Sequence, residues 1–156
     1  LRSVHQGGDG TLYATAFTGM TLSHDGGCTW EAVPGEMAGR EVTAIVPDPA
    51  APASVWATAL DKGETALWRS GDAGRTWRPV YTLPGTGLPG LALSPDGQRV
   101  YLTALAGGPQ PEPMLYVSTD GGTRFTGRPI TPRPDLPRVS LLGADPRDGS
   151  VVYLRF

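Results

Sequence analysis

Short clusters of apolar and β-branched residues run along the whole chain, and turn-forming Gly, Pro and Asp separate them. In the middle of the chain four such clusters follow one another, at residues 42–46, 55–60, 67–70 and 77–81. Runs of this length that are rich in Val, Thr, Tyr and Trp are typical of β-strands, and four of them joined by turns are typical of one propeller blade. The pattern therefore predicts an all-β chain built from four-stranded antiparallel units.

The same order of strands and turns precedes and follows this unit. The preceding clusters lie at residues 3–5, 12–17, 20–23 and 30–33, and the following ones lie at 88–93, 100–105, 114–118 and 125–130. A last pair occupies residues 139–142 and 151–156. We expect a β-propeller segment with blades at about 1–35, 40–83 and 87–131 and half a blade at about 137–156.

Such a segment does not close a ring, because a propeller of about six or seven blades needs roughly twice this length. An open array would leave two sheet faces exposed to water. We therefore expect the rest of its own propeller, or another copy, to complete it. Within the array, Trp56 and Tyr101 recur on the second strand of their blades and are predicted to pack between sheets.

An eight-residue motif accompanies the strands and marks the repeat. Residues 23–30, 70–77 and 118–125 each begin with Ser-x-Asp, and Asp25, Asp72 and Asp120 are 47 and 48 residues apart. In a tight hairpin such an Asp accepts hydrogen bonds from its own turn, and a Gly permits positive φ. Because the three carboxylates lie on different blades, they cannot form one catalytic pair or one shared metal site. We interpret the motif as structural.

Composition and charge narrow the classes of function. The chain has 22 Gly and 16 Pro, yet its apolar clusters are regular, which is typical of a turn-rich β protein. A formal net charge of −2 gives no basic field for a nucleic-acid partner. Cys28 is the only cysteine, and His5 and His24 lack metal-ligand spacing, so neither a disulfide nor a metal site is expected. No cofactor is expected either.

Two further observations concern the membrane and the start of the chain. The sequence contains no apolar run of about 20 residues, so no membrane span is expected. It opens at Leu1 without an initiator Met or a basic-then-apolar leader, so we expect either a removed leader or an excerpt of a longer chain.

The eight-residue motif resembles the Asp-box, or bacterial neuraminidase repeat, whose pattern is Ser-x-Asp-x-Gly-x-Thr-Trp. The first two copies match every fixed position, and the third departs from the pattern at Arg124 and Phe125. The residues that match the family motif are Ser23, Asp25, Gly27, Thr29, Trp30, Ser70, Asp72, Gly74, Thr76, Trp77, Ser118, Asp120 and Gly122, with Phe125 in the aromatic position. Such repeats occur in sialidases, xyloglucan-degrading glycosidases, sortilin-type receptors, photosystem II assembly factors and many secreted bacterial proteins. The resemblance implies an extracytoplasmic or secreted propeller.

In that family the boxes lie on one face of the propeller and ligands bind on the other. The resemblance assigns five loops to the ligand face here, at residues 34–41, 61–65, 82–87, 106–113 and 127–137. The candidate ligand-face residues in them are Arg40, Asp61, Lys62, Glu64, Glu112, Arg128, Arg133 and Asp135. Two of these loops are proline-rich, which fits either a stiff binding surface or a rigid spacer. A carbohydrate or a protein is the expected ligand.

Fold-level resemblance does not choose a function. A sialidase needs an Arg-Ile-Pro motif near its start, whereas here Arg128, Pro129 and Ile130 follow the third box. The xyloglucan-degrading glycosidases use a pair of carboxylates on either side of a cleft between two propellers. The Asp and Glu residues of this chain cannot be paired across such a cleft. No catalytic residue is assigned. We favour a non-catalytic binding or assembly scaffold. The alternative is a fragment of a secreted glycoside hydrolase, sialidase-like or xyloglucanase-like, whose catalytic residues lie outside this chain.

Overall fold

The computed structural model describes residues 3–16, 18–61, 64–83, 85–106, 109, 111–131 and 139–156. Its strands form three four-stranded sheets and one two-stranded sheet, each antiparallel with its strands in chain order. Blade 1 contains β1 (Ser3–Gln6), β2 (Leu12–Ala16), β3 (Gly19–Ser23) and β4 (Glu31–Ala32). Blade 2 contains β5 (Glu41–Pro47), β6 (Val55–Asp61), β7 (Glu64–Ser70) and β8 (Arg78–Leu83). Blade 3 contains β9 (Gly85–Leu93), β10 (Val100–Ala106), β11 (Pro113–Ser118) and β12 (Thr126–Pro129). The half-blade contains β13 (Ser140–Ala144) and β14 (Val152–Arg155).

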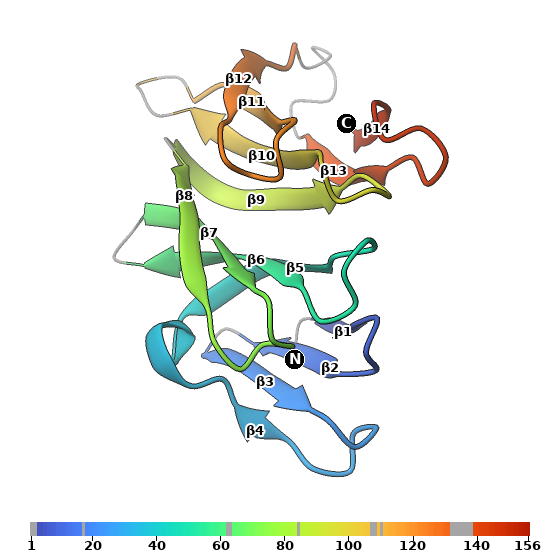
Figure 1. Cartoon of the computed structure of the whole chain (residues 1–156). Coiled ribbons are helices and arrows are strands. Elements are labelled where there is room, and N and C mark those ends of the chain that lie inside the picture. The colour runs from blue at the N-terminus through green and yellow to red at the C-terminus, as the bar shows by residue number, and fades with distance from the viewer. Residues whose placement is uncertain are drawn as a thin grey trace.

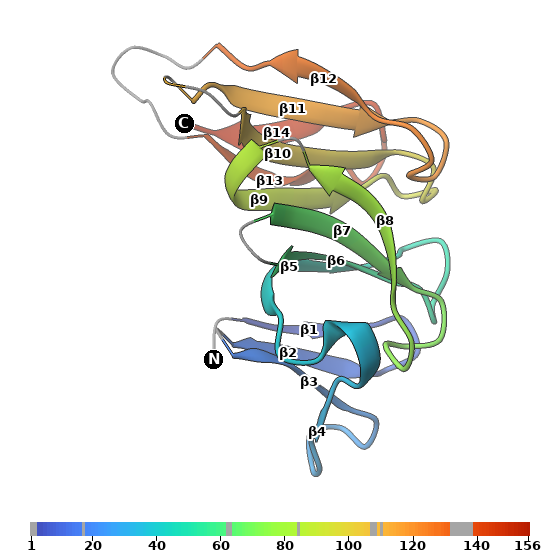
Figure 2. The same cartoon turned by 90° about the vertical axis from the view of Figure 1, so that its left-hand side faces the viewer.

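Blades 1, 2 and 3 follow one another upward in Figures 1 and 2, and the half-blade lies beside blade 3, in contact with β9 and β10. This arrangement confirms the predicted all-β fold of four-stranded antiparallel blades, with about three and a half blades in the chain. Among the described residues, no helix combines the length and the apolar character that crossing a bilayer requires.

The predicted loops at 82–87 and 34–41 contain regular structure that the sequence did not indicate. The segment 82–87 is strand except for residue 84, which lies outside the described residues, because β10 extends its pairing with β9 through a bulge as far as Gly85. The segment 34–41 contains a short 3-10 helix, η1 (Gly35–Met37), which places Met37 in the core. The strand in segment 82–87 becomes apparent only in the folded sheet, because the Gly and Pro residues of this segment indicate a turn.

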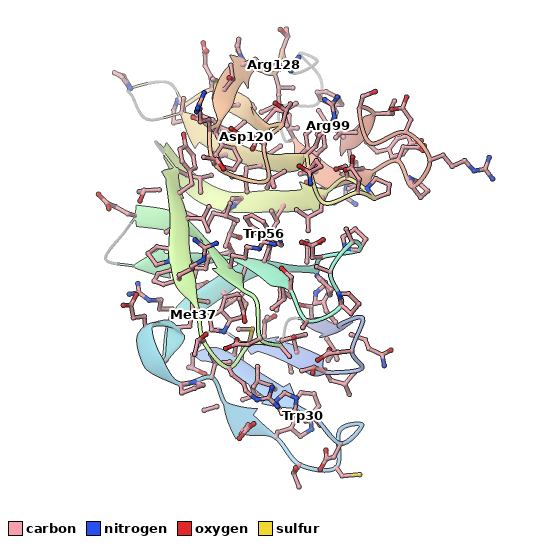
Figure 3. All side chains as sticks on the ribbon, in the orientation of Figure 1. Trp30, Met37, Trp56, Arg99, Asp120 and Arg128 are labelled. Carbon is pink, nitrogen blue, oxygen red and sulfur yellow. The ribbon has the colours of Figure 1, made fainter. Side chains whose placement is uncertain are left out.

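Apolar side chains fill the space between successive sheets. The first core cluster joins Tyr13 and Met20 of blade 1 to Ala57 and Trp68 of blade 2. The second joins Trp56 of blade 2 to residues of blade 3, and Figure 3 shows Trp56 between these sheets. The third includes Tyr101 and residues of the half-blade. Trp56 and Tyr101 therefore pack between sheets, and burial of this apolar surface is the main force that holds the blades together.

The sheets have two distinct ends. At one end, which we call the turn end, each of the second and third copies of the eight-residue motif is hydrogen-bonded to the first turn of its own sheet: Ala73 N–H donates to the Ala53 carbonyl, and Gly121 N–H to that of Gln98. Because the strands are antiparallel, the connections from second to third strand and from one sheet to the next lie at the opposite end. We call this the loop end, and η1 belongs to it (Figure 1, left).

Candidate functional site

The turn end is built from three copies of one hydrogen-bonding pattern, in what we call the repeated turns (residues 23–30, 70–77 and 118–125). In each, the Ser hydroxyl donates to the Asp carboxylate at 2.8 Å. The same hydroxyl accepts the N–H of the Gly four residues later, at 2.8 to 2.9 Å. That Gly has φ of +94°, +85° and +86° in the three turns, a conformation that a residue with a β-carbon rarely adopts. The pattern is local, so each turn is specified by its own residues.

The third repeated turn lacks the Thr hydroxyl bond that the other two make to the Asp carboxylate. Thr29 and Thr76 each donate a side-chain hydroxyl to the Asp carboxylate at 2.6 Å, as well as a backbone N–H. Arg124 occupies this position in the third turn and donates only its backbone N–H, at 2.9 Å. The neighbouring Thr123 hydroxyl instead donates to the backbone carbonyl of Asp120, at 2.9 Å. Arg124 in place of Thr therefore removes one hydrogen bond, and Phe125 in place of Trp removes a second, the indole bond to the Gly carbonyl, but the turn is kept.

These hydrogen bonds stabilise the ionised form of the turn aspartates. The side-chain and backbone bonds from Thr29, followed by the bond from Ser23, hold the pKa of Asp25 well below its usual range. The backbone bond from Arg124 and the bond from Ser118 lower the pKa of Asp120. A carboxylate with a lowered pKa that is bonded within its own turn is poorly suited to act as a general acid. All three turn aspartates therefore use their carboxylates in hydrogen bonds within their own turns.

The aromatic residue that ends each turn meets the preceding sheet where one is present. Trp77 donates its indole N–H to the Gly74 carbonyl at 2.9 Å and is 9% exposed in the core between blades 1 and 2. Phe125 stacks on Tyr81 of blade 2, with ring centroids 4.4 Å apart. Trp30 makes the same indole bond to Gly27 but is 43% exposed on blade 1. The position serves contact between blades.

The candidate ligand-face residues do not form one cluster. Arg40 and Glu64 line a single pocket at the loop end, with a volume of about 230 Å³. Arg128 lies on β12 of blade 3, opposite Leu115, and Figure 3 shows it far along the stack from Met37 of η1. Glu112 accepts the N–H of Ala106 through its backbone carbonyl. Lys62, Arg133 and Asp135 lie outside the described residues, and only the backbone of Asp61 is described, paired with Glu64.

Sequence reasoning missed the residue that connects Arg40 to Glu64. Trp68 lies on β7 four residues after Glu64. Because side chains alternate along a strand, both residues face the same side of the sheet. The Arg40 guanidinium lies over the Trp68 ring, 4.8 Å from its centroid. In the sequence Trp68 is one aromatic residue among several in strand clusters, and the alternation Glu64, Ala66, Trp68 is the only signal that could have grouped it with the loop end.

Comparison with known proteins identifies a fold and no closer relationship. Neither the family models nor the curated proteins include a match to this chain. The GH74 xyloglucanase from Xanthomonas campestris is similar in structure over 97% of this chain and 26% of its own, with a TM-score of 0.69 and 20% identity. TolB from Acinetobacter baumannii matches over 92% of this chain and 33% of its own, with a TM-score of 0.61 and 16% identity.

A third similar structure is the α-L-arabinofuranosidase Arb93A from Fusarium graminearum, with a TM-score of 0.62 and 14% identity over 88% of this chain and 50% of its own. The chain therefore spans between about a quarter and a half of the length of these proteins. Together with the sheet topology, these similarities show that the chain has the fold of part of a β-propeller.

Proposed function

We propose that this chain is part of a non-catalytic, extracytoplasmic propeller that serves as a binding or assembly scaffold. The observation that carries the proposal concerns the carboxylates that recur in the repeated turns: Asp25, Asp72 and Asp120 are each hydrogen-bonded inside their own turn and lie on three separate sheets. Among the described residues, no group of three or more His, Cys, Asp or Glu is suited to hold a metal ion. The turn end supports blades, and the loop end is left for a ligand.

The two outer sheets support the assembly part of the proposal. Blade 1 exposes Val4 and Trp30, and the half-blade exposes Leu142, Val151 and Tyr153. At the inner interfaces the equivalent positions are buried. Trp77 is the equivalent of Trp30, and the equivalents of Tyr153 are Tyr13, Trp56 and Tyr101. Large apolar side chains gathered on an outer sheet are typical of an interaction surface. We propose that further blades, from the same protein or from another copy, cover them.

A segment of a glycoside hydrolase is the second candidate. What favours it is that a xyloglucanase and an α-L-arabinofuranosidase are among the similar structures. In this case the carboxylates that act on the glycosidic bond would come from blades outside residues 1–156.

Hydrolysis assays distinguish the two candidates. The full-length protein, with any blades outside residues 1–156, is incubated with xyloglucan, arabinan and a sialoside, and released reducing sugar and free sialic acid are measured. Affinity electrophoresis in gels that contain each polysaccharide, with dextran as the control, reports binding. The scaffold proposal predicts no release from any substrate, with or without retardation in the gel. Release that exceeds a heat-denatured sample would overturn it and support the glycosidase.

A further inference from the structure

A second pocket, of about 420 Å³, lies on blade 3 beside the third repeated turn. It is lined by Val117, Thr119, Asp120, Arg124, Thr126 and Arg128. Thr126 pairs with Val117 and Arg128 pairs with Leu115, so these side chains share one face of the sheet. Leu115 and Val117 pack toward the half-blade, which contacts β9 and β10 and leaves β12 exposed. The pocket is therefore open to solvent on the outer part of this face.

The pocket contains two guanidinium groups that a ligand can reach. Arg124 and Arg128 are exposed, and among the described residues neither side chain forms an ion pair. Arg124 donates a hydrogen bond to Asp120 through its backbone N–H, which leaves its side chain available. The exposed hydroxyls of Thr119 and Thr126 lie in the same lining. Because guanidinium groups only donate hydrogen bonds and hydroxyls can donate them, this set of groups favours an anion.

The departure of the third turn from the Asp-box pattern creates part of this pocket. Arg124 stands where the motif has Thr, so a guanidinium replaces a hydroxyl. In the first two turns that Thr hydroxyl donates to Oδ2 of the Asp. The described hydrogen bonds to the Asp120 carboxylate all reach Oδ1, so Oδ2 keeps its capacity to accept. The replacement therefore places a cation in the pocket and leaves an acceptor beside it.

The charges of the lining select the kind of anion. Two guanidinium groups and one carboxylate leave the pocket with a single net positive charge, which a singly charged anion balances. An anion with two charges would be repelled more strongly by Asp120. A sulfate ester carries one negative charge on three free oxygens, so it can accept from both arginines and a Thr hydroxyl at once, whereas a carboxylate has only two oxygens. A hydroxyl next to the ester can donate to Oδ2 of Asp120.

We propose that this pocket binds the sulfate ester of a sulfated sugar, with the ester oxygens at Arg124 and Arg128 and a neighbouring hydroxyl at Asp120. The contacts are exposed to water, so the dissociation constant is expected in the millimolar range. On blade 2, Thr76 and Arg78 occupy the places of Arg124 and Thr126, and both are exposed although blade 3 packs on that sheet. A further blade would therefore leave the site accessible, and binding does not depend on the proposed scaffold function.

The test is an NMR titration that follows the backbone amide signals of the ¹⁵N-labelled chain. D-glucose 6-sulfate is expected to shift the signals of Arg124, Thr126 and Arg128 in a saturable way. D-glucose, with sodium chloride added to match the ionic strength, should leave them nearly unchanged. D-glucose 6-phosphate carries nearly two negative charges at neutral pH and should bind more weakly than the sulfate. No saturable shift with the sulfate, or equal or tighter binding of the phosphate, overturns the proposal.

Two variants locate the contacts. Arg124→Thr restores the residue of the Asp-box, and with it a hydroxyl that can donate to Asp120, so the turn should stay folded while binding weakens. Arg128→Gln removes the other charge and keeps a polar side chain. Each variant is expected to weaken binding of glucose 6-sulfate about threefold to fivefold, since an exposed ion pair contributes only modestly in water.

Arg78→Gln is the matched control for both variants. It removes an exposed guanidinium from the same end of blade 2, outside the pocket, and should leave the affinity nearly unchanged. Thermal unfolding of all three variants verifies that they are folded. Unchanged affinity in Arg124→Thr or in Arg128→Gln would exclude that contact and overturn the proposal. An equal loss in Arg78→Gln would show that only the general charge of the chain attracts the ligand, which overturns it as well.

Discussion

A β-carbon on Gly122 would lie 2.6 Å from Cη2 of Trp56, so the third repeated turn rests directly on the second-strand aromatic of the preceding blade. Gly74 has the same relationship to Tyr13 of blade 1, at 3.0 Å from Cε1. The glycine of a repeated turn therefore has two roles: it allows positive φ inside the turn, and it leaves room for the neighbouring ring. The motif thus sets the distance between blades as well as the shape of a hairpin.

This double role predicts a large loss of stability for Gly122→Ala. The substitution strains a backbone with φ of +86° and places a methyl group against the buried Trp56 ring, so we expect it to cost about 2 to 4 kcal/mol. Gly121→Ala is the control, since φ is +65° there but no atom lies within 4 Å of the added carbon. It should cost only about 1 kcal/mol. Urea unfolding followed by tryptophan fluorescence measures both, and equal losses would show that the contact with Trp56 contributes nothing.

Thr29 is predicted to control the ionisation of Asp25. Thr29→Val removes the hydroxyl that donates to the carboxylate at 2.6 Å, so the pKa of Asp25 should rise toward its ordinary value of about 3.9. Thr123→Val in the third turn is the control, because that hydroxyl donates to a backbone carbonyl and should leave the pKa of Asp120 nearly unchanged. Titration of the carboxyl carbons by NMR gives both values. A low pKa of Asp25 in Thr29→Val would contradict this explanation.

The lowered pKa values also determine how stability depends on pH. Since Asp25 and Asp120 have lower pKa values in the folded chain than in the unfolded chain, their contribution is present above about pH 4. It is lost as the pH falls from there through the folded-state values. We expect the urea midpoint to decrease below about pH 4, with a shallower decrease in Asp25→Asn. A midpoint that stays constant between neutral pH and about pH 3 would contradict the prediction.

The sheets and the repeated turns could be predicted from sequence because both depend on local pattern. Alternation and turn residues specify each strand, and the motif makes its hydrogen bonds within eight residues. The extension of β9 to Gly85 depends on pairing with β10 across a register shift, and burial of Met37 depends on how η1 packs against two sheets. Such features can be recognised only when the strand or sheet that they pack against is known.

The loop-end pocket shows the same division between local and tertiary information. Arg40 and Glu64 were each predicted to face a ligand, but β5, β6 and the connections that follow them separate the two residues in the sequence. Nothing local joins them. Trp68 looks like an ordinary core aromatic in the sequence, and its unused indole N–H becomes apparent only when the hydrogen bonds of the neighbouring residues are known.

Asp48 lies in the turn between the first and second strands of blade 2, and it is predicted to contribute more to stability than Asp145 in the equivalent turn of the half-blade. It is 5% exposed and accepts from Trp56 Nε1 at 3.3 Å, while the Arg69 guanidinium lies 3.5 Å away. Asp48→Ala leaves the buried Trp56 indole N–H without its acceptor and Arg69 without its ion pair, so we expect a loss of about 2 to 3 kcal/mol in urea unfolding.

The half-blade supplies the control for Asp48. Asp145 occupies the equivalent turn and accepts from the Tyr153 hydroxyl, but Tyr153 is 48% exposed and water can replace the lost bond. Asp145→Ala should therefore cost less than about 1 kcal/mol. A loss as large as that of Asp48→Ala would mean that the burial of the Trp56 pair is not what makes it important.

Trp30 and Tyr153 are predicted to lie at the two ends of a head-to-tail contact when residues 1–156 are studied alone. Trp30 is exposed where Trp77 is buried, and Tyr153 is exposed where Trp56 is buried. Sedimentation velocity should show association that increases with concentration. Trp30→Ser and Tyr153→Ser should each weaken it, whereas Leu105→Ser, which removes an exposed apolar residue of blade 3, should not. A mixture of the two weakened variants should form dimers, because each retains the end that the other lacks. A monomer at every concentration would contradict association between copies and leave further blades of the same protein as the cover.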